Sequence, residues 1–246
     1  MHRMITICFD FGNTRLKAAI FDADTLLEEL VLADDSNLSV MTLVEKYKPA
    51  RTILSSVINH NPEIEAILQN QSRFHKLSPS TKINFTTPVG KPETIGADRL
   101  ALMAATAHYF AGKHNLVIAL GSCITYNFLN QHGEFLGGGI SPGMDMRFKA
   151  MHDYTAKLPL INASWNFPLI GYDTKTNMLS GVIHGMANEI EGFIQKYEDK
   201  YSNFNVVLTG GNSAYFASQV KKRIFADHNF LFKGLYVLSE LNNCDH

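Results

Sequence analysis

Short apolar runs and helical stripes alternate along the first part of the chain. Residues 5–11 and 16–21 are apolar runs rich in β-branched and aromatic side chains, and Gly12-Asn13 separates them. This pattern predicts a β-hairpin. The runs and stripes that follow predict a strand at 27–32, a helix at 38–47, a strand at 51–57, a helix at 61–68 and a weak strand at 74–77.

The second half of the chain repeats this design after a helix that begins at Gly96. Apolar residues of that helix fall on one predicted face: Leu100, Met103, Ala104, Ala107 and Phe110. Residues 115–129 then form another strand, a Gly-Ser turn and a strand, about 110 residues after the first hairpin, which indicates a duplicated domain. We therefore predict two domains, 1–114 and 115–246.

The remaining elements follow from the same reasoning. They are a glycine-rich strand at 135–143, helices at 143–154 and 174–197, a strand at 204–208, a helix at 213–224 and a closing strand at 230–238. Asp173 or Thr174 would cap the long helix, and Gly181 and Gly185 within it predict close helix packing. A hairpin followed by strands alternating with helices is typical of an α/β fold with mixed sheets.

Composition narrows the class of protein. The chain is 46% hydrophobic and 18% charged with a net charge of −1, so no broad basic surface suits nucleic acid. Three widely spaced cysteines do not form a disulfide framework, which favours a reducing compartment. The N-terminal apolar run is broken by Asp10 and predicts neither a signal peptide nor a membrane span. We expect a cytoplasmic protein.

The turn of the first hairpin carries the first candidate chemistry. Asp10 closes the strand, Gly12 permits close backbone approach, and donors follow at Asn13, Thr14, Arg15 and Lys17. Successive backbone N–H groups and nearby cations suit phosphate, and a carboxylate among phosphates suits a bound Mg²⁺. The alternative is an ordinary surface hairpin with a capping aspartate.

Further motifs lie at helix starts and glycine turns. Asp98 falls in the first turn of its helix, where the dipole favours an ionised carboxylate, although helix-start chemistry alone would explain it. Gly137-Gly138-Gly139 permits close approach of a ligand or another chain, the alternative being a flexible linker. Thr209-Gly210-Gly211 between a strand and a helix is a natural nucleotide contact.

In this order and spacing, the motifs resemble those of the type III pantothenate kinases, a family of the actin-like ATPase superfold. Five stretches carry the resemblance: 10–14, 96–99, 137–143, 173–181 and 209–211. The resemblance implies two similar actin-like ATPase (ribonuclease H-like) domains with mixed sheets, ATP in the cleft between them, and a homodimer. It implies transfer of the ATP γ-phosphate to pantothenate, the first step of coenzyme A biosynthesis.

The resemblance also implies roles for single residues. ATP phosphates and Mg²⁺ would be held by Asp10, Phe11, Gly12, Asn13, Thr14, Arg15, Leu16 and Lys17, with Ser122 also touching ATP and Asp10 holding Mg²⁺ through water. Pantothenate would be held by Gly96, Ala97, Asp98, Arg99 and Thr174. Asp98 would be the general base, which takes the proton of the acceptor hydroxyl.

Two positions depart from the family pattern. Ala119 stands where the family has an aspartate that helps to place K⁺ or NH₄⁺, so the need for a monovalent cation is open. Val89 replaces a substrate-contacting tyrosine. A non-catalytic relative that regulates by binding a ligand, and another small-molecule kinase or phosphatase on the same fold, are the alternative functions.

Overall fold

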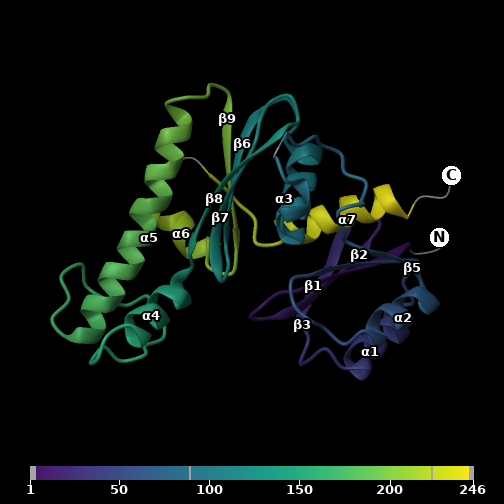
Figure 1. Ribbon diagram of the computed structural model, residues 1–246, viewed down its shortest axis with the longest axis horizontal. Coiled ribbons are helices and arrows are strands. Elements are labelled where there is room, and N and C mark those ends of the chain that lie inside the picture. The colour runs from purple at the N-terminus through teal and green to yellow at the C-terminus, as the bar shows by residue number, and fades with distance from the viewer. Residues whose placement is uncertain (1–3, 89, 223, 244–246) are drawn as a thin grey trace. The chain divides into compact units, whose positions relative to one another are not determined.

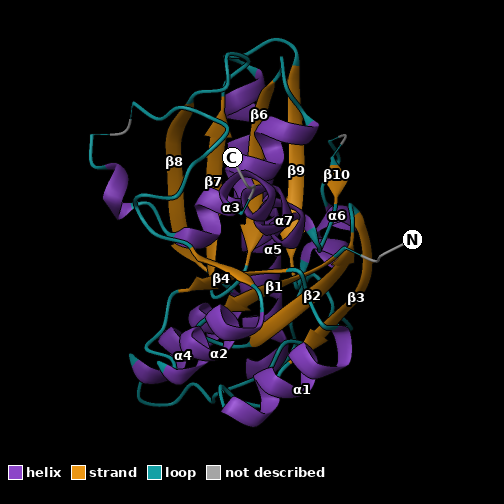
Figure 2. Ribbon diagram, turned by 90° about the vertical axis from the view of Figure 1, so that its right-hand side faces the viewer, coloured by secondary structure: helices purple, strands orange, loops and turns teal. Residues whose placement is uncertain are grey.

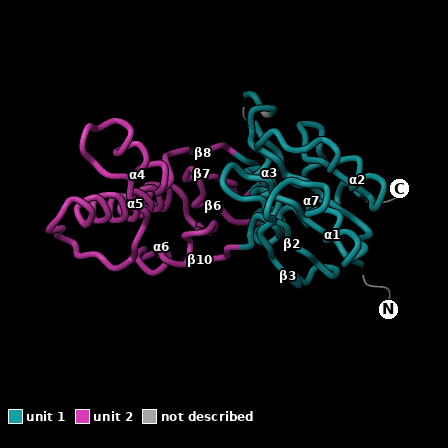
Figure 3. Tube along the Cα trace, turned by 90° about the horizontal axis from the view of Figure 1, so that it is seen from below, with its two compact units in different colours: residues 1–111, 132–135, 229–246 teal, residues 112–131, 136–228 magenta. Residues whose placement is uncertain are grey.

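The computed structural model describes residues 4–88, 90–222 and 224–243 (Figure 1), so Val89 lies outside the described residues. Contacts group the chain into two compact units, residues 1–111, 132–135 and 229–246, and residues 112–131 and 136–228 (Figure 3). The chain first passes from the first unit to the second between residues 111 and 112, close to the predicted boundary at 114. Residues 229–246, which were predicted to belong to the second domain, group with the first unit. The division into domains 1–114 and 115–246 remains a prediction.

The first unit is built on a five-stranded mixed sheet with the order β3-β2-β1-β4-β5. The hairpin strands β1 and β2 are antiparallel, β3 continues antiparallel, and β4 and β5 add parallel strands on the other side of β1. The strands span Ile5–Phe11 (β1), Leu16–Asp22 (β2), Thr25–Val31 (β3), Arg51–Ser56 (β4) and Arg73–Lys76 (β5). All five lie where the sequence pattern predicts strands.

Helices cover this sheet because alternate residues of β1 point to opposite faces. Ile5, Ile7, Phe9 and Phe11 share one buried cluster with α1 (Asn37–Tyr47) and α2 (Glu63–Gln71), which pack side by side (Figure 2). The helices α3 (Ala97–Tyr109) and α7 (Phe230–Asn242) of the same unit pack against each other, and both contact β4. A 3-10 turn, Pro92–Thr94, precedes α3.

The predicted closing strand at 230–238 is wrong, because these residues form α7. A continuous apolar run does not distinguish a strand from a buried helix. Phe230, Phe232, Leu235 and Leu238 are all buried, and a Cβ on Gly234 would lie 1.8 Å from the Ala101 carbonyl oxygen. α3 is likewise buried along residues 101–106, whereas the predicted face included Leu100, Ala107 and Phe110, which are not among its buried residues.

The second unit repeats the strand order of the first, as β8-β7-β6-β9-β10. β6 and β7 form the hairpin, and β9 is parallel to β6. The strands span His114–Leu120 (β6), Cys123–Leu129 (β7), Phe135–Pro142 (β8), Phe204–Gly210 (β9) and Phe225–Ala226 (β10). The repeated hairpin design in the sequence therefore corresponds to a repeated sheet.

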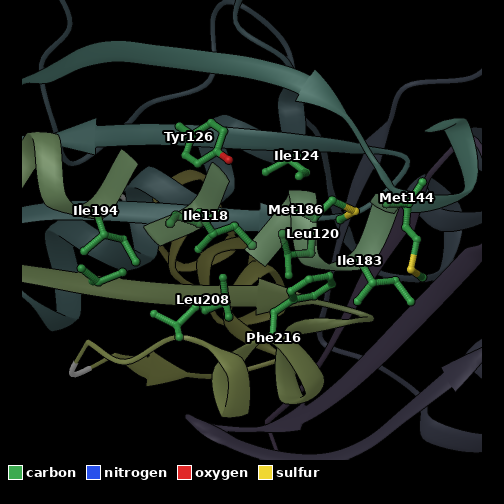
Figure 4. Close-up of a cluster of buried hydrophobic side chains, with 14 of the residues drawn as sticks. Ile118, Leu120, Ile124, Tyr126, Met144, Ile183, Met186, Ile194, Leu208 and Phe216 are labelled. Atoms are coloured by element: carbon green, nitrogen blue, oxygen red, sulfur yellow. The ribbon is translucent and has the colours of Figure 1, made fainter. Parts of the chain in front are cut away.

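The core of the second unit lies between this sheet and its helices, α4 (Met144–Asp153), α5 (Thr174–Glu198) and α6 (Ser213–Gln219). Figure 4 shows Ile118, Leu120 and Tyr126 from the sheet meeting Ile183, Met186 and Ile194 from α5. Asp173 caps α5, as predicted, in a capping box with Thr176.

The glycines of this unit differ in how closely other atoms approach them. Gly181 and Gly185 were expected to permit close helix packing, and this is wrong, because a Cβ on either would meet no atom within 4 Å. Gly138 does permit close approach, since its Cβ would lie 1.8 Å from the Tyr126 carbonyl oxygen. The chain that approaches it is the neighbouring strand β7 of the same unit.

Candidate active site

Asp10 lies at the end of β1, in a row of polar side chains that crosses the first sheet. The register places Lys17 of β2 on one side of it and Ser55 of β4 on the other. Paired residues of neighbouring strands point to the same face of a sheet. The row Lys17–Asp10–Ser55 therefore presents a cation, a carboxylate and a hydroxyl on one face.

Asp98 reaches this region from the first turn of α3. The helix begins after Gly96, which serves as the N-cap residue without a side chain. A Cβ on Gly96 would lie 2.6 Å from Oδ1 of Asp98, so the carboxylate folds back over the glycine. In the Gly-Ala-Asp-Arg motif, the glycine leaves the space into which the Asp98 carboxylate folds. The positive end of a helix favours a negatively charged group in its first turn.

The charge of Asp98 acts on the carboxyl group of Asp10. The pKa of Asp10 is raised to about 6, mainly by burial and also by the negative charge of Asp98, whereas the Ser55 hydroxyl and the charge of Lys17 act in the opposite direction. The charge of Lys17, which is bound to Glu29, does not offset burial and the second carboxylate. Asp10 and Asp98 are thus a charge pair that a divalent cation would stabilise.

The donor set fits Mg²⁺ only in a particular way. Among the described residues there is no group of three His, Cys, Asp or Glu side chains that could form a complete metal site. Mg²⁺ in phosphoryl-transfer sites is held by one or two carboxylates together with water and substrate phosphates. Asp10 is placed to supply such a carboxylate.

The turn after Asp10 differs in detail from the predicted set of phosphate donors. The Gly12 N–H donates to the Arg15 carbonyl oxygen at 3.1 Å, which closes the turn and leaves the Asn13, Thr14 and Arg15 residues exposed. Lys17 is held by Glu29, with 2.6 Å between Nζ and Oε1. The Phe11 side chain is fully buried in the core, so Phe11 offers a ligand only its backbone. The Leu16 side chain is half-buried. The ATP contacts of residues 10–17 remain predictions.

Arg99 stands beside Asp98 at the start of α3. Burial lowers its pKa, and the charge of Asp98 opposes that shift. Its guanidinium lies 5.3 Å from the centre of the Phe135 ring. This ring packs on Phe85, and the backbone around it exchanges two hydrogen bonds with Thr86. The loop before α3 and the 132–135 turn thus support Arg99 within the first unit.

The other predicted site residues lie in the second unit. Ser122 is exposed in the β6–β7 turn, and its carbonyl oxygen accepts the Gly143 N–H at 3.0 Å. Thr174 is exposed as the first residue of α5. Thr209 is buried at the end of β9, and a Cβ on Gly210 would lie 2.4 Å from the Leu120 carbonyl oxygen, so that glycine serves the approach of two strands.

Ala119 occupies in the second sheet the position that Asp10 occupies in the first. Its neighbours in the row are Thr125 of β7 and Thr209 of β9. The Thr209 hydroxyl is buried and has no hydrogen-bond partner among the described residues. The row offers a monovalent cation hydroxyl oxygens but no carboxylate, so the residues present do not fit the charged site that the family pattern implies.

Sequence reasoning missed two groups near these positions. Ser55 and Glu29 lie on separate strands from Asp10 and Lys17, and only the sheet register brings each pair together. The Ser-Ser ending of β4 is the sole signal that the sequence offers for Ser55.

No helix in the described part of the chain has the length and apolar character needed to cross a membrane.

The repeated sheet, with its hairpin and parallel strands, defines the class as the actin-like ATPase fold. A glucokinase from an Antarctic psychrotroph matches 98% of this chain and 100% of its own with a TM-score of 0.51 at 10% identity. A Campylobacter jejuni protein named after the Baf family of transcriptional activators matches 96% and 98% with a TM-score of 0.60 at 21% identity. These likenesses concern the fold alone.

The family follows from the sequence comparisons. A family model described as type III pantothenate kinase matches residues 6–196. The type III pantothenate kinase of Christiangramia forsetii is 36% identical over 240 residues, covering 97% of this chain and 99% of the relative. That of Bacteroides fragilis strain ATCC 25285 is 37% identical over 246 residues, with coverages of 97% and 99%. The chain belongs to the type III pantothenate kinase family and is an ATP-dependent kinase.

Proposed function

We propose that this protein transfers the γ-phosphate of ATP to the primary hydroxyl of pantothenate, giving ADP and 4′-phosphopantothenate, the first step of coenzyme A biosynthesis. Family membership supports this, and the observation that carries it is the Asp98 carboxylate folded over Gly96 at the start of α3 and close enough to Asp10 to raise its pKa. Phosphoryl transfer depends on positioning and charge neutralisation more than on covalent help.

Asp98 is the general base in this proposal. It accepts the proton of the pantothenate hydroxyl as the oxygen–phosphorus bond forms and the bond to ADP breaks. A base must be ionised, and the N-terminal end of α3 favours that form. Arg99 beside it, with Gly96, Ala97 and Thr174, holds pantothenate, and the guanidinium suits the pantothenate carboxylate.

Residues 10–17 and Ser122 bind ATP. Asp10 holds Mg²⁺ through water, and Mg²⁺ bound to ATP neutralises charge on the phosphates. The exposed Arg15 suits a phosphate, since it makes no ion pair with another described residue. The Lys17 ammonium lies 2.6 Å from Oε1 of Glu29. Lys17 must release this carboxylate in order to bind a phosphate.

Two further properties complete the proposal. Activity should depend only weakly on K⁺, because Ala119 offers no carboxylate and Thr125 and Thr209 offer only hydroxyls.

The active form is a cytoplasmic homodimer, with part of α5 or the region 137–143 at the interface. Ile140 of β8 is 64% exposed and α5 has three exposed glycines, which suits a covered surface. Sedimentation that shows only monomer at micromolar concentration would contradict the dimer.

The direct test incubates the protein with ATP, Mg²⁺ and pantothenate and detects 4′-phosphopantothenate by mass. Product formed by the wild type, at a rate that Asp98→Asn lowers by about 10²-fold or more, supports the proposal. Absence of product from wild-type protein that still binds ATP would point to a different acceptor. The regulatory alternative gains no support from the Campylobacter jejuni structure, because 21% identity concerns the fold alone.

A further inference from the structure

A carboxylate within the second unit collects hydrogen bonds from three other elements. Glu189 of α5 accepts from the Tyr126 hydroxyl of β7 at 2.8 Å, from the Ser141 hydroxyl of β8 and from the Arg147 guanidinium of α4. The side chains of Glu189 and Arg147 are each only 22% exposed. Four elements are therefore joined at one charged group.

The charge on Glu189 is stabilised where it lies. Burial raises its pKa, but the hydrogen bonds from Ser141, Arg147 and Tyr126 lower it more, so the net shift is downward. Burial and the neighbouring Glu189 raise the pKa of Tyr126, whose hydroxyl therefore stays protonated and donates. Partly buried, charge-assisted hydrogen bonds of this kind hold geometry more firmly than exposed pairs.

This network fixes the end of β8. Ser141 is bound to Glu189, and Nε of Arg147 donates to the carbonyl oxygen of the next residue, Pro142, at 2.9 Å. The backbone N–H of Arg147 donates to the Gly143 carbonyl oxygen at 3.0 Å. Residues 141–143 are thus held on both their side-chain and backbone atoms by Glu189 and Arg147.

The end of β8 lies directly against the β6–β7 turn. The Gly143 N–H donates to the Ser122 carbonyl oxygen at 3.0 Å. A Cβ on Gly143 would lie 2.3 Å from the Gly121 carbonyl oxygen and 2.5 Å from that of Ser122. Because no space separates the two segments, a shift of residues 141–143 toward the turn that carries Ser122 must move that turn, and a shift away from it breaks the hydrogen bond.

We propose that Glu189 is a positioning residue for nucleotide binding: through Ser141 and Arg147 it sets the position of Gly143 and hence of the Ser122 turn. This rests on the proposed function in one respect, the contact of Ser122 with ATP. Glu189 acts on ATP through other residues. A purely structural network would change stability while leaving the affinity for ATP unaltered, which makes the two roles separable.

The test is Glu189→Gln, which keeps the shape of the side chain and removes the charge that Arg147 requires. A displacement of about 1 Å at a binding group can cost up to roughly 10²-fold. We expect the KM for ATP, and the Kd for ATP with Mg²⁺ measured calorimetrically without pantothenate, to rise about tenfold or more. The KM for pantothenate should change less than that for ATP.

Glu198→Gln is the matched control, because Glu198 lies at the end of the same helix and its ion pair among the described residues is with Lys222. It should leave both KM values within about twofold, because this pair is more exposed than Glu189–Arg147 and contacts neither residues 141–143 nor the Ser122 turn. Cys123, next to Ser122, supplies a readout without nucleotide: its alkylation, followed by mass spectrometry, should quicken in Glu189→Gln and not in the control.

Ser141→Ala removes one hydrogen bond and keeps the proposal testable should Glu189→Gln fail to fold. It should raise the Kd for ATP in the same direction by a smaller factor. Unchanged affinity for ATP in folded Glu189→Gln or Ser141→Ala would overturn the inference while leaving pantothenate phosphorylation intact. Failure of the wild type to phosphorylate pantothenate would instead count against the proposed function.

Discussion

The two sheets have the same strand order but differ in the polar row that crosses the end of the first hairpin strand. In the first unit the row is Lys17–Asp10–Ser55. At the corresponding register positions of the second unit it is Thr125–Ala119–Thr209. One row carries two charges, and the other carries hydroxyls and a methyl group on the same backbone arrangement.

This difference separates what the fold needs from what the chemistry needs. The second sheet forms without a carboxylate at this position, so Asp10 is not required by strand pairing. Asp10 has a pKa raised to about 6, an unfavourable state that folding alone would not select.

The largest expected effect concerns the acid that faces the charged row. Asp98→Asn keeps the shape of the side chain and removes the proton acceptor, and loss of a general base costs about 10²–10⁴-fold in rate. Steady-state turnover with saturating ATP and pantothenate measures this. A rate within a few-fold of wild type would remove Asp98 from the role of base.

Asp10→Asn tests the charged row itself. We expect the Mg²⁺ concentration for half-maximal rate to rise by roughly 10–100-fold, the range seen when outer-shell partners of a metal are lost. The circular dichroism spectrum should be unchanged, since the second sheet folds with Ala119 in the same place. An Asp10→Asn protein that does not fold would show that the carboxylate is structural.

The row Thr125–Ala119–Thr209 should make the wild-type rate depend only weakly on K⁺. Exchange of K⁺ for Na⁺ at constant ionic strength should change the wild-type rate only a few-fold, because about six or more oxygen ligands suit a large cation and Ala119 supplies none. Ala119→Asp gives Thr209 a carboxylate neighbour and should introduce a dependence on K⁺. A wild-type rate that collapses without K⁺ would mean that other oxygens form the site.

The smallest effect is a shift in titration. Asp10 must be ionised to hold a cation, so kcat/KM for ATP should fall below about pH 6 as Asp10 takes up a proton. Because the charge of Asp98 raises the pKa of Asp10, Asp98→Asn should lower it, and NMR titration of the Asp10 carboxyl carbon measures this. An unchanged pKa would show that the two carboxylates do not interact.

Local pattern determined most of the secondary structure and the position of each motif. Alternating and β-branched runs gave both hairpins, and an acidic first turn placed Asp98 at the start of α3. Asp173, one of the two predicted N-cap residues, marked the start of α5 in the same way. These features depend on residues within a few positions of one another, which is the range over which sequence spacing carries information.

Only the tertiary structure decided how distant segments meet. The apolar run 230–238 is compatible with a strand or a buried helix, and its packing against α3 at Gly234 selected the helix α7. Strand register, set by pairing across whole sheets, brought Ser55 beside Asp10 and Thr209 beside Ala119. Sequence alone placed the acids of the site, whereas long-range pairing decided which neighbours set their charge, because such contacts depend on the whole fold.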